Sequence, residues 1–320
     1  MFYELLGRVI DSDVCMPCLS ARSPATPDIR IRQMVGPPAP AARLVFESER
    51  LREDGSVSAR LGRDDSGYSW SFRDLADFCL SRDGSLIEWS SHAGERRDLV
   101  TLLAGSVVAF ALQLQGLTGL HGNGLVHGTA AFGLLGPSGY GKSSLSSMLM
   151  RRGCDFLTDD FLAIEFKSGT PMALPGLQRL KLWPDAVERL LPRETATEAY
   201  VSWLPKQSIS PVALGGGIAE ARPLAALFVL VPIAAPEAPT AQRLHGEQAL
   251  AALVANSYQA HLLTAEPELM ASRLDFLQAL LDKAPVYALG CPRSFDRLRE
   301  TAEVVLSHVG LAGGKAAASR

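Results

Sequence analysis

The sequence predicts an α/β protein in which a β-rich N-terminal lobe precedes a larger domain with a mixed sheet and a phosphate loop. Two observations lead to this prediction. Short apolar or alternating runs, separated by Gly, Pro, Asp and Ser clusters, fill the first hundred residues, as is typical of β-structure. Farther along, an apolar strand runs into a glycine-rich turn, and a helix with one apolar face follows. We therefore expect a β-rich lobe at residues 1–95, an α/β domain at 96–312 and a disordered tail at 313–320.

The composition is close to the average for soluble globular proteins. Hydrophobic residues make up 47% of the 320 residues and charged residues 20%. The formal net charge is −3, from 31 basic and 34 acidic residues, and no long basic run occurs. A nucleic-acid partner is therefore not expected, because it would require a clustered basic surface.

The cysteine pattern indicates a cytoplasmic protein. The five cysteines are scattered and odd in number, which argues against a disulfide framework. Cys15 and Cys18 have the spacing of a zinc or thiol-exchange motif, but no second cysteine pair occurs, and both lie in a Pro- and Ser-rich stretch. We interpret them as structural or incidental. The N-terminus also lacks a signal-peptide pattern.

The elements of the first lobe are short strands, and an uncharged segment follows them. We predict the strands at residues 3–10, 29–34, 43–47, 68–72 and 86–89. Residues 100–120 carry no charge and are about as long as a membrane span. Polar residues such as Gln113 interrupt this segment, and Gly116 and Gly119 break its end. We therefore predict a buried helix at 102–115, belonging to the second domain, and no membrane contact.

Apolar periodicity defines the elements of the second domain. We predict strands at 120–126 and 130–135, a helix from Ser143 to Gly153, and strands at 156–157 and 161–166. Farther on, the same patterns predict strands at 226–231 and 286–289 and helices at 250–254, 269–281 and 295–305.

Residues 136–143 read GPSGYGKS and fit the phosphate-loop pattern G-x-x-x-x-G-K-[ST]. The glycines allow the backbone to curl so that consecutive N–H groups point into one concavity, and the following helix adds its positive end. Lys142 can reach the β- and γ-phosphates, and the Ser143 hydroxyl can ligate Mg²⁺. We expect ATP and Mg²⁺ as ligands, with GTP as the open alternative. The predicted nucleotide-binding residues are Gly136, Pro137, Ser138, Gly139, Tyr140, Gly141, Lys142, Ser143 and Ser144.

Two aspartates follow the next predicted strand. Asp159 and Asp160 come seventeen and eighteen residues after Lys142, and in a βαβ unit the ends of the two strands lie at the same edge of the sheet. Adjacent residues on a strand point to opposite sides. One carboxylate can therefore bind Mg²⁺ while the other accepts a proton from an incoming hydroxyl. The alternative is an Asp-Asp turn that caps the strand.

Two histidines, His121 and His127, precede the loop. A histidine on an apolar strand is more often structural than catalytic, so the residues alone leave both roles open.

The segments LHGNGLVHG, GPSGYGKS and RRGCDFLTDD together resemble the catalytic core of HPr kinase/phosphorylase. The features in register are His121-Gly122, the phosphate loop, Arg152-Gly153 and Asp159-Asp160. The resemblance implies an HPr-kinase-like fold with catalytic residues Asp159, His121 and Lys142. Asp159 would be the general base with His121 beside it, and Asp160 with Ser143 would lie on the metal side. His127 has no counterpart.

Outside residues 118–166 the match to HPr kinase proper fades. The segments YELLGRVIDSDVCMPCL, YSWSFRDLADF and PGLQRLKLWPDAVERL instead resemble HPr-kinase-related proteins, some of which are serine kinases that tailor lasso-peptide precursors. This resemblance implies transfer of a γ-phosphoryl group to a serine or threonine hydroxyl of a peptide or small protein, and the parent family implies a homo-oligomer. Two alternatives stay open: a nucleotide-binding switch without an acceptor, and a bifunctional HPr kinase/phosphorylase. Lys206 is either a surface lysine or a phosphate contact.

Overall fold

The computed structural model describes residues 1–36, 41–48, 58–92, 96–263 and 266–317. The chain forms two compact units, and both sheets and helices occur in it, so the protein is mixed α/β. The first unit comprises Met1–Leu117, Val201–Leu204 and His261–Met270. The second comprises Thr118–Tyr200, Pro205–Ala260 and Ala271–Arg320.

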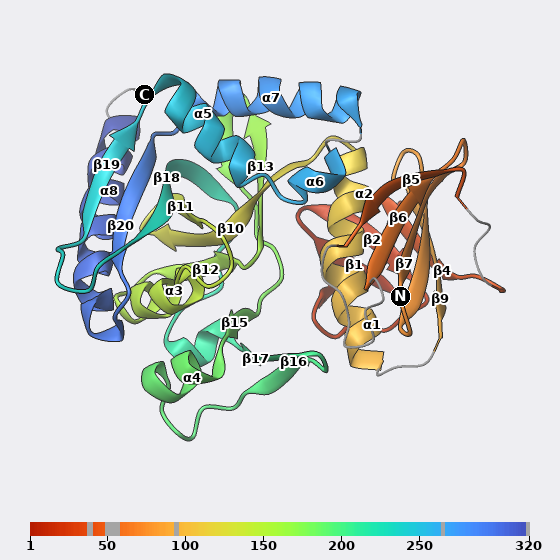
Figure 1. Ribbon diagram of the computed structural model, residues 1–320, viewed down its shortest axis with the longest axis horizontal. Coiled ribbons are helices and arrows are strands. Elements are labelled where there is room, and N and C mark those ends of the chain that lie inside the picture. The colour runs from red at the N-terminus through yellow and green to blue at the C-terminus, as the bar shows by residue number, and fades with distance from the viewer. Residues whose placement is uncertain (37–40, 49–57, 93–95, 264–265, 318–320) are drawn as a thin grey trace. The chain divides into compact units, whose positions relative to one another are not determined.

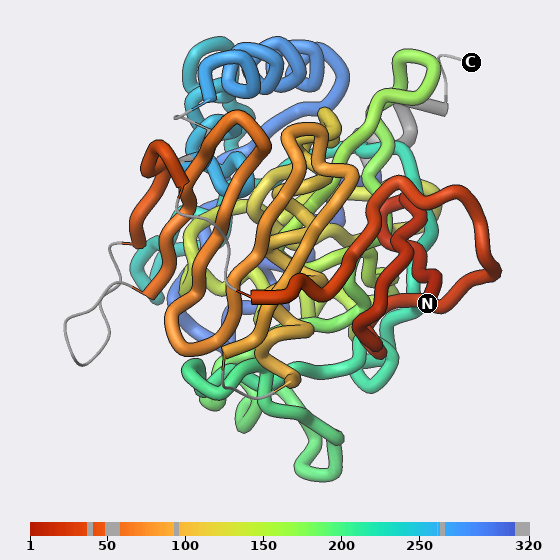
Figure 2. The backbone as a smooth tube through the Cα atoms, turned by 90° about the vertical axis from the view of Figure 1, so that its right-hand side faces the viewer, coloured from red at the N-terminus to blue at the C-terminus, as the bar shows by residue number. Residues whose placement is uncertain are grey.

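A nine-stranded sheet makes up most of the first unit, with strand order β3-β1-β2-β4-β9-β8-β7-β6-β5. Figure 2 shows its successive antiparallel hairpins from β6 to β9. Alternation buries one face, as in β4, where Ile29 and Ile31 are buried and Arg30 is exposed. This confirms a β-rich N-terminal region. The strands are β1 (Phe2–Leu5), β2 (Arg8–Ser12), β3 (Ser20–Ala21), β4 (Ile29–Gln33), β5 (Arg43–Glu47), β6 (Ala59–Arg63), β7 (Gly67–Phe72), β8 (Ala76–Ser81) and β9 (Leu86–Ser91).

A helical segment follows the strands, made of α1 (Arg96–Leu102), a π-helical turn (Leu103–Val107) and α2 (Val108–Leu114). Within the described residues, Arg96–Leu114 is the stretch long and apolar enough to cross a membrane, and 72% of its most apolar window is buried inside the protein. Phe110 packs edge-on against Tyr68 and Trp70 of β7, with ring centroids 5.2 and 5.7 Å apart. These contacts are those of a helix buried in a protein core.

The helical segment belongs to the first unit, which corrects the expectation that it opens the second domain. The reason is its packing, since Phe110 is buried against the aromatic side chains of β7. The units divide between Leu117 and Thr118. The predicted boundary at residue 95 lies outside the described residues.

The second unit contains an eight-stranded mixed sheet in the order β11-β10-β13-β14-β18-β20-β19, with β12 paired to β10. Strand β11 also pairs with β18. Each of the strands β11, β10, β13, β14 and β18 is therefore paired with the next, and the last is paired with the first. Strand β10 is antiparallel to β11, β12 and β13, whereas β18 is parallel to β11 and β20. The strands are β10 (Thr118–His127), β11 (Ala130–Leu135), β12 (Asp155–Thr158), β13 (Phe161–Lys167), β14 (Thr170–Ala173), β18 (Arg222–Ile233), β19 (Thr240–Leu244) and β20 (Val286–Pro292).

Helices cover both faces of this sheet (Figure 1). Leu145 and Leu149 of α3 (Lys142–Arg151) share a buried cluster with Val305 of α8 (Leu298–Ala317). Leu253 of α5 (Gly246–Ala255) and Leu277 of α7 (Pro267–Leu281) belong to a second cluster. This unit also contains α4 (Pro184–Leu190) and two 3₁₀ turns at Pro211–Leu214 and Phe295–Arg297, whereas most of α6 (Ala260–Leu263) belongs to the first unit.

Helix α8 continues to Ala317, so the disordered tail predicted from residue 313 is wrong as far as Ala317. Residues 318–320 lie outside the described residues. A separate three-stranded sheet, β15-β17-β16, is made of β15 (Leu180–Leu182), β16 (Glu198–Val201) and β17 (Leu204–Ile209).

Candidate functional site

The glycine-rich loop joins β11 to α3. Gly136, Gly139 and Gly141 have φ angles of 137°, 86° and 90°, which residues with a side chain rarely adopt. Gly141 is the N-cap of α3 and is left-handed. The sequence therefore needs glycine at these three positions to turn the chain from strand to helix.

The loop leaves a group of backbone donors unsatisfied. Among the described residues, the N–H groups of Gly139, Gly141, Lys142, Ser143 and Ser144 have no acceptor. Pro137, Ser138 and Gly139 are exposed. Unsatisfied N–H donors at the positive end of a ten-residue helix are suited to bind phosphate oxygens. The residues present therefore fit a polyphosphate group.

Lys142 begins α3, and its side chain turns back over the loop. Its amine donates hydrogen bonds to the carbonyls of Gly136 and Pro137, the latter at 3.1 Å. Burial lowers the pKa of Lys142 to about 8, with Asp159 opposing the shift and Lys206 and Lys181 adding to it. At neutral pH the side chain is therefore mostly an ammonium ion held at the loop.

Asn123, in the middle of β10, fixes the start of α3. Its amide Nδ2 donates to Ser146 Oγ at 3.0 Å, and Ser146 Oγ donates to the carbonyl of Lys142 at 2.9 Å. Both side chains are fully buried. Sequence reasoning missed this link, although Asn123 is a polar residue inside an otherwise apolar strand, which is a usable signal.

His121 lies on β10 between the loop and the acidic pair. Its neighbour Gly122 pairs with Leu135, the last residue of β11, and His121 pairs with Phe161. Its Nε2 lies 3.4 Å from Lys142 Nζ. Burial, together with the charges of Lys142 and Lys181, lowers the pKa of His121 to about 4, so the ring is neutral at pH 7. The polar side-chain contact of His121 is thus Lys142, its ring lies 6.2 Å from that of Tyr258, and no hydrogen bond joins it to Asp159 within the described residues.

The acidic pair occupies a tight turn after β12. Strands β11 and β12 both run antiparallel to β10, so their carboxyl ends lie at the same end of the sheet. The Phe161 amide donates to the Asp159 carbonyl at 2.9 Å, and Asp160 between them has a φ of 66°. This is a γ-turn of the rarer, strained kind.

The two carboxylates do not point to opposite sides, which corrects the prediction from strand alternation. Both reach the ammonium of Lys181, which contacts Asp160 and lies 3.8 Å from Asp159 Oδ2. The reason is the positive φ of Asp160, which takes the pair out of the strand geometry on which alternation depends.

Backbone amides hold Asp159 in place. Its Oδ1 accepts the N–H of Asp160 and its Oδ2 accepts the N–H of Lys181, each at 3.0 Å. The side chain is only 3% exposed, whereas that of Asp160 is 38% exposed. Asp159 is therefore the fixed carboxylate of the pair and Asp160 the accessible one.

Lys181, on β15, is the main residue that sequence reasoning missed. Burial lowers its pKa, and Asp159 opposes the shift. Its ammonium also lies 4.9 Å from the centre of the Tyr200 ring. Burial and the charge of Asp159 raise the pKa of Tyr200 to about 12, so the phenol is neutral. A lysine between Leu180 and Leu182 on a buried strand is the signal that could have found it.

Lys206, on β17, is half-buried rather than a free surface lysine. Its amine lies 5.1 Å from the centre of the Trp183 ring. Burial and the charge of Lys181 lower its pKa, whereas Asp159 raises it. Three lysines therefore surround the acidic turn, and their combined charge favours a polyanionic ligand.

The predicted metal ligands are not in contact. Within the described residues, Ser143 Oγ makes no hydrogen bond and Asp160 pairs with Lys181. No group of three His, Cys, Asp or Glu side chains in the described part of the chain is arranged to hold a metal ion. A Mg²⁺ ion at this place would take most of its ligands from phosphate and water, as is usual for that ion.

Comparison with known proteins gives a distant structural likeness. The structure of the Hpr(Ser) kinase/phosphatase from Coxiella burnetii matches 63% of this chain and 96% of its own chain, at 13% sequence identity and a TM-score of 0.35. No family model matches the sequence. No curated protein matches it either. The likeness is too distant to assign an activity.

Other candidate residues lie apart from this site. His127 is exposed, and its Nδ1 is 3.9 Å from the buried thiol of Cys154. Burial raises the pKa of Cys154 to about 12, so the thiol is unreactive at neutral pH. Cys15 is exposed and Cys18 is partly buried.

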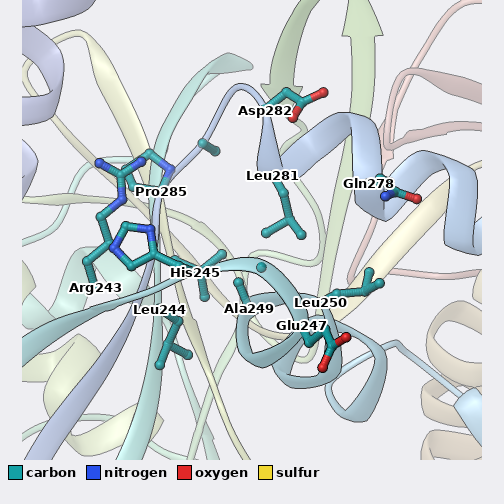
Figure 3. Close-up of a pocket in the computed structure, with 13 residues that line it drawn as sticks. Arg243, Leu244, His245, Glu247, Ala249, Leu250, Gln278, Leu281, Asp282 and Pro285 are labelled. Carbon is teal, nitrogen blue, oxygen red and sulfur yellow. The ribbon is translucent and has the colours of Figure 1, made fainter.

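A cavity of about 430 Å³ lies among β19, α5 and the end of α7. Figure 3 shows Leu281 and Ala249 facing its interior, while Asp282 and Gln278 point outward. It contains none of the residues predicted as site residues.

Proposed function

We propose that the protein is an ATP- and Mg²⁺-dependent kinase that transfers the γ-phosphoryl group to a serine or threonine hydroxyl of a peptide or small protein. One observation carries the proposal. A loop with unsatisfied N–H donors and the ammonium of Lys142 share one end of a sheet with the turn that bears Asp159 and Asp160. Donors for phosphate and carboxylates for a metal and a hydroxyl are the parts that phosphoryl transfer needs.

Each residue has a role in this proposal. The amides of Gly139 and of residues 141–144 would bind phosphate oxygens, and Lys142 would move from the loop carbonyls to the β- and γ-phosphates. Asp160 and Ser143 would hold Mg²⁺, which shields the phosphate charge when bound. Asp159 would accept the hydroxyl proton, since each carboxylate oxygen has a second lone pair besides the one that binds a backbone amide.

His121 would act as a neutral group in this site. Its lowered pKa keeps the ring uncharged, and its contact with Lys142 suits a residue that orients the lysine. The resemblance to the HPr kinase core would place it beside the base instead, and a direct contact of His121 with Asp159 would require movement in the turn.

A second candidate is a nucleotide-binding switch without an acceptor. It is favoured by the double anchoring of Asp159, because a carboxylate whose two oxygens both bind backbone amides is suited to shaping a turn. The two functions differ in whether phosphate leaves the nucleotide for a peptide.

Incubation with Mg-ATP and serine-containing peptides, followed by mass spectrometry, tests the proposal. We expect a peptide to gain one phosphoryl group with the wild-type protein and not with Lys142→Ala. ATP hydrolysis with every peptide unmodified would favour the switch. Unchanged ATP binding in Lys142→Ala would refute the nucleotide site itself.

A further inference from the structure

Lys181 is a buried cation between two carboxylates of unequal exposure. Its side chain is 10% exposed, against 3% for Asp159 and 38% for Asp160. A buried ammonium is stable only when it is paired, because removing it from water costs several kcal/mol. Lys181 therefore needs at least one of the two carboxylates at all times.

The two carboxylates differ in how firmly they are held. Asp159 is fixed by the backbone amides of Asp160 and Lys181. Within the described residues, the carboxylate of Asp160 is bound by the Lys181 ammonium alone. Asp160 can thus leave Lys181 without breaking any other bond of its side chain, whereas Asp159 cannot move away.

Lys181 would remain paired if Asp160 left. Its ammonium is 3.8 Å from Asp159 Oδ2 and 4.9 Å from the centre of the Tyr200 ring. Both interactions are independent of Asp160. The two carboxylates and the ammonium have a net charge of −1. An added divalent cation brings the net charge of the group to +1, which attracts phosphate.

We propose that Lys181 and the divalent cation of a bound nucleotide compete for Asp160, so that Asp160 exchanges the ammonium for the metal while Lys181 keeps Asp159. The inference rests on the proposed nucleotide site. The exchange makes and breaks ion pairs only, with no covalent step. Its consequence is that Lys181 weakens metal binding and confines it to states in which phosphate also attracts the metal.

The test is the affinity of the protein for Mn²⁺ in the presence of the ATP analogue AMP-PNP, measured from the electron paramagnetic resonance of free Mn²⁺. We expect Lys181→Met to bind Mn²⁺ at least about threefold more tightly than the wild type, and Asp160→Asn about tenfold more weakly. Lys206→Met is the matched control, because it removes a neighbouring positive charge that has no contact with Asp160. Its effect should be smaller.

A double-mutant cycle identifies the partner. Lys181→Met should have no effect on Mn²⁺ affinity in the Asp160→Asn background. The inference is overturned if Lys181→Met tightens Mn²⁺ binding no more than Lys206→Met, or tightens it equally without Asp160. Lys181→Gln, which keeps a hydrogen-bond donor, replaces Lys181→Met if the latter does not fold.

The same measurements separate this inference from the proposed function. Failure of the wild-type protein to bind AMP-PNP would overturn both. Normal AMP-PNP binding with equal Mn²⁺ affinity in the wild type, Lys181→Met and Lys181→Gln would overturn only the exchange at Asp160.

Discussion

Lys142 makes nucleotide binding depend on pH in a predictable direction. Its pKa is about 8 because of burial. Raising the pH from 7.5 to 9.5 therefore converts the Lys142 ammonium, which pairs with phosphate, into a neutral amine. We expect the affinity for Mg-ATP to fall, with a limiting slope of about tenfold per pH unit above pH 8. Calorimetric titration at a series of pH values measures this.

Lys142→Arg is the control for that profile, because arginine stays charged throughout the range. Its affinity should be lower than that of the wild type but flat with pH. An equal fall in the arginine variant would assign the pH dependence to another group.

Asp159→Asn should separate binding from chemistry. The amide keeps the size of the side chain but cannot accept a proton, so transfer should drop roughly 10² or more while nucleotide affinity changes little. One of the two backbone amides loses its acceptor, which should also cost about 1–3 kcal/mol of stability. Kinetic assays together with urea unfolding distinguish the two effects. Parallel loss of binding and transfer would show that nucleotide binding also needs the Asp159 carboxylate, either at the metal or as the partner of Lys181.

Some residues of the candidate site could be predicted from the sequence, and others could not. The glycines of the loop and the lysine after them follow a pattern in which spacing reflects backbone geometry. Lys181 has no such pattern, because only the pairing of β15 with β17 and the turn at Asp159 bring it to the site. The orientation of Asp160 could not be predicted, since nothing in the sequence specifies a positive φ at a non-glycine residue.

The turn after β12 stores strain that substitution can reveal. Asp160 has a φ of 66°, which costs a residue with a side chain about 1 kcal/mol or more relative to glycine. Asp160→Gly and Asp160→Ala both remove the carboxylate, so they lose the pairing with Lys181 equally. We expect the glycine variant to be the more stable by about 1 kcal/mol.

Urea unfolding of the two variants measures this difference. A more stable alanine variant would mean that the turn relaxes to an ordinary conformation once the side chain is lost, and that the strain is imposed by Lys181.

At the scale of elements, apolar periodicity predicts the strands and helices around the loop. It does not predict which strands pair with one another. Strands β10 to β13 and helix α3 lie close to where apolar spacing predicts them. The pairing of β11 with β18 joins residues about a hundred positions apart, and short-range periodicity carries no information about it. The strands of the small sheet were missed because they are short and their apolar residues do not alternate clearly.

The stability of the whole protein should fall on acidification, partly because of His121. Its pKa of about 4 in the folded state lies below the usual value near 6.5. Between these values the unfolded chain binds a proton that the folded chain does not. Stability should therefore decrease as the pH falls from 6.5 toward 4, by at most about 1.4 kcal/mol per pH unit from this residue.

Urea unfolding between pH 7 and 4.5 tests this, with His121→Gln as the control that cannot titrate. The difference in slope between the two proteins is the contribution of His121. Equal slopes would show that the ring is free to protonate in the folded state.

The division into two units was only partly predictable. A β-rich region followed by an α/β region is visible in the spacing of apolar runs. The assignment of residues 96–117 to the first unit depends on what the helix packs against, and Phe110 packs on β7. An apolar helix can be buried in either unit, so its sequence does not specify which one.

The pairing of β11, β18 and β20 also affects folding during synthesis, because the ribosome makes these strands one after another. When the loop after β11 leaves the exit tunnel, its parallel neighbour β18 has not been made, and β20 and α8 follow later still. Since parallel strands cannot pair until the connection between them is complete, the nascent loop and Lys142 have no finished sheet to support them. We expect the nucleotide site to form only after β18 has emerged and paired with β11.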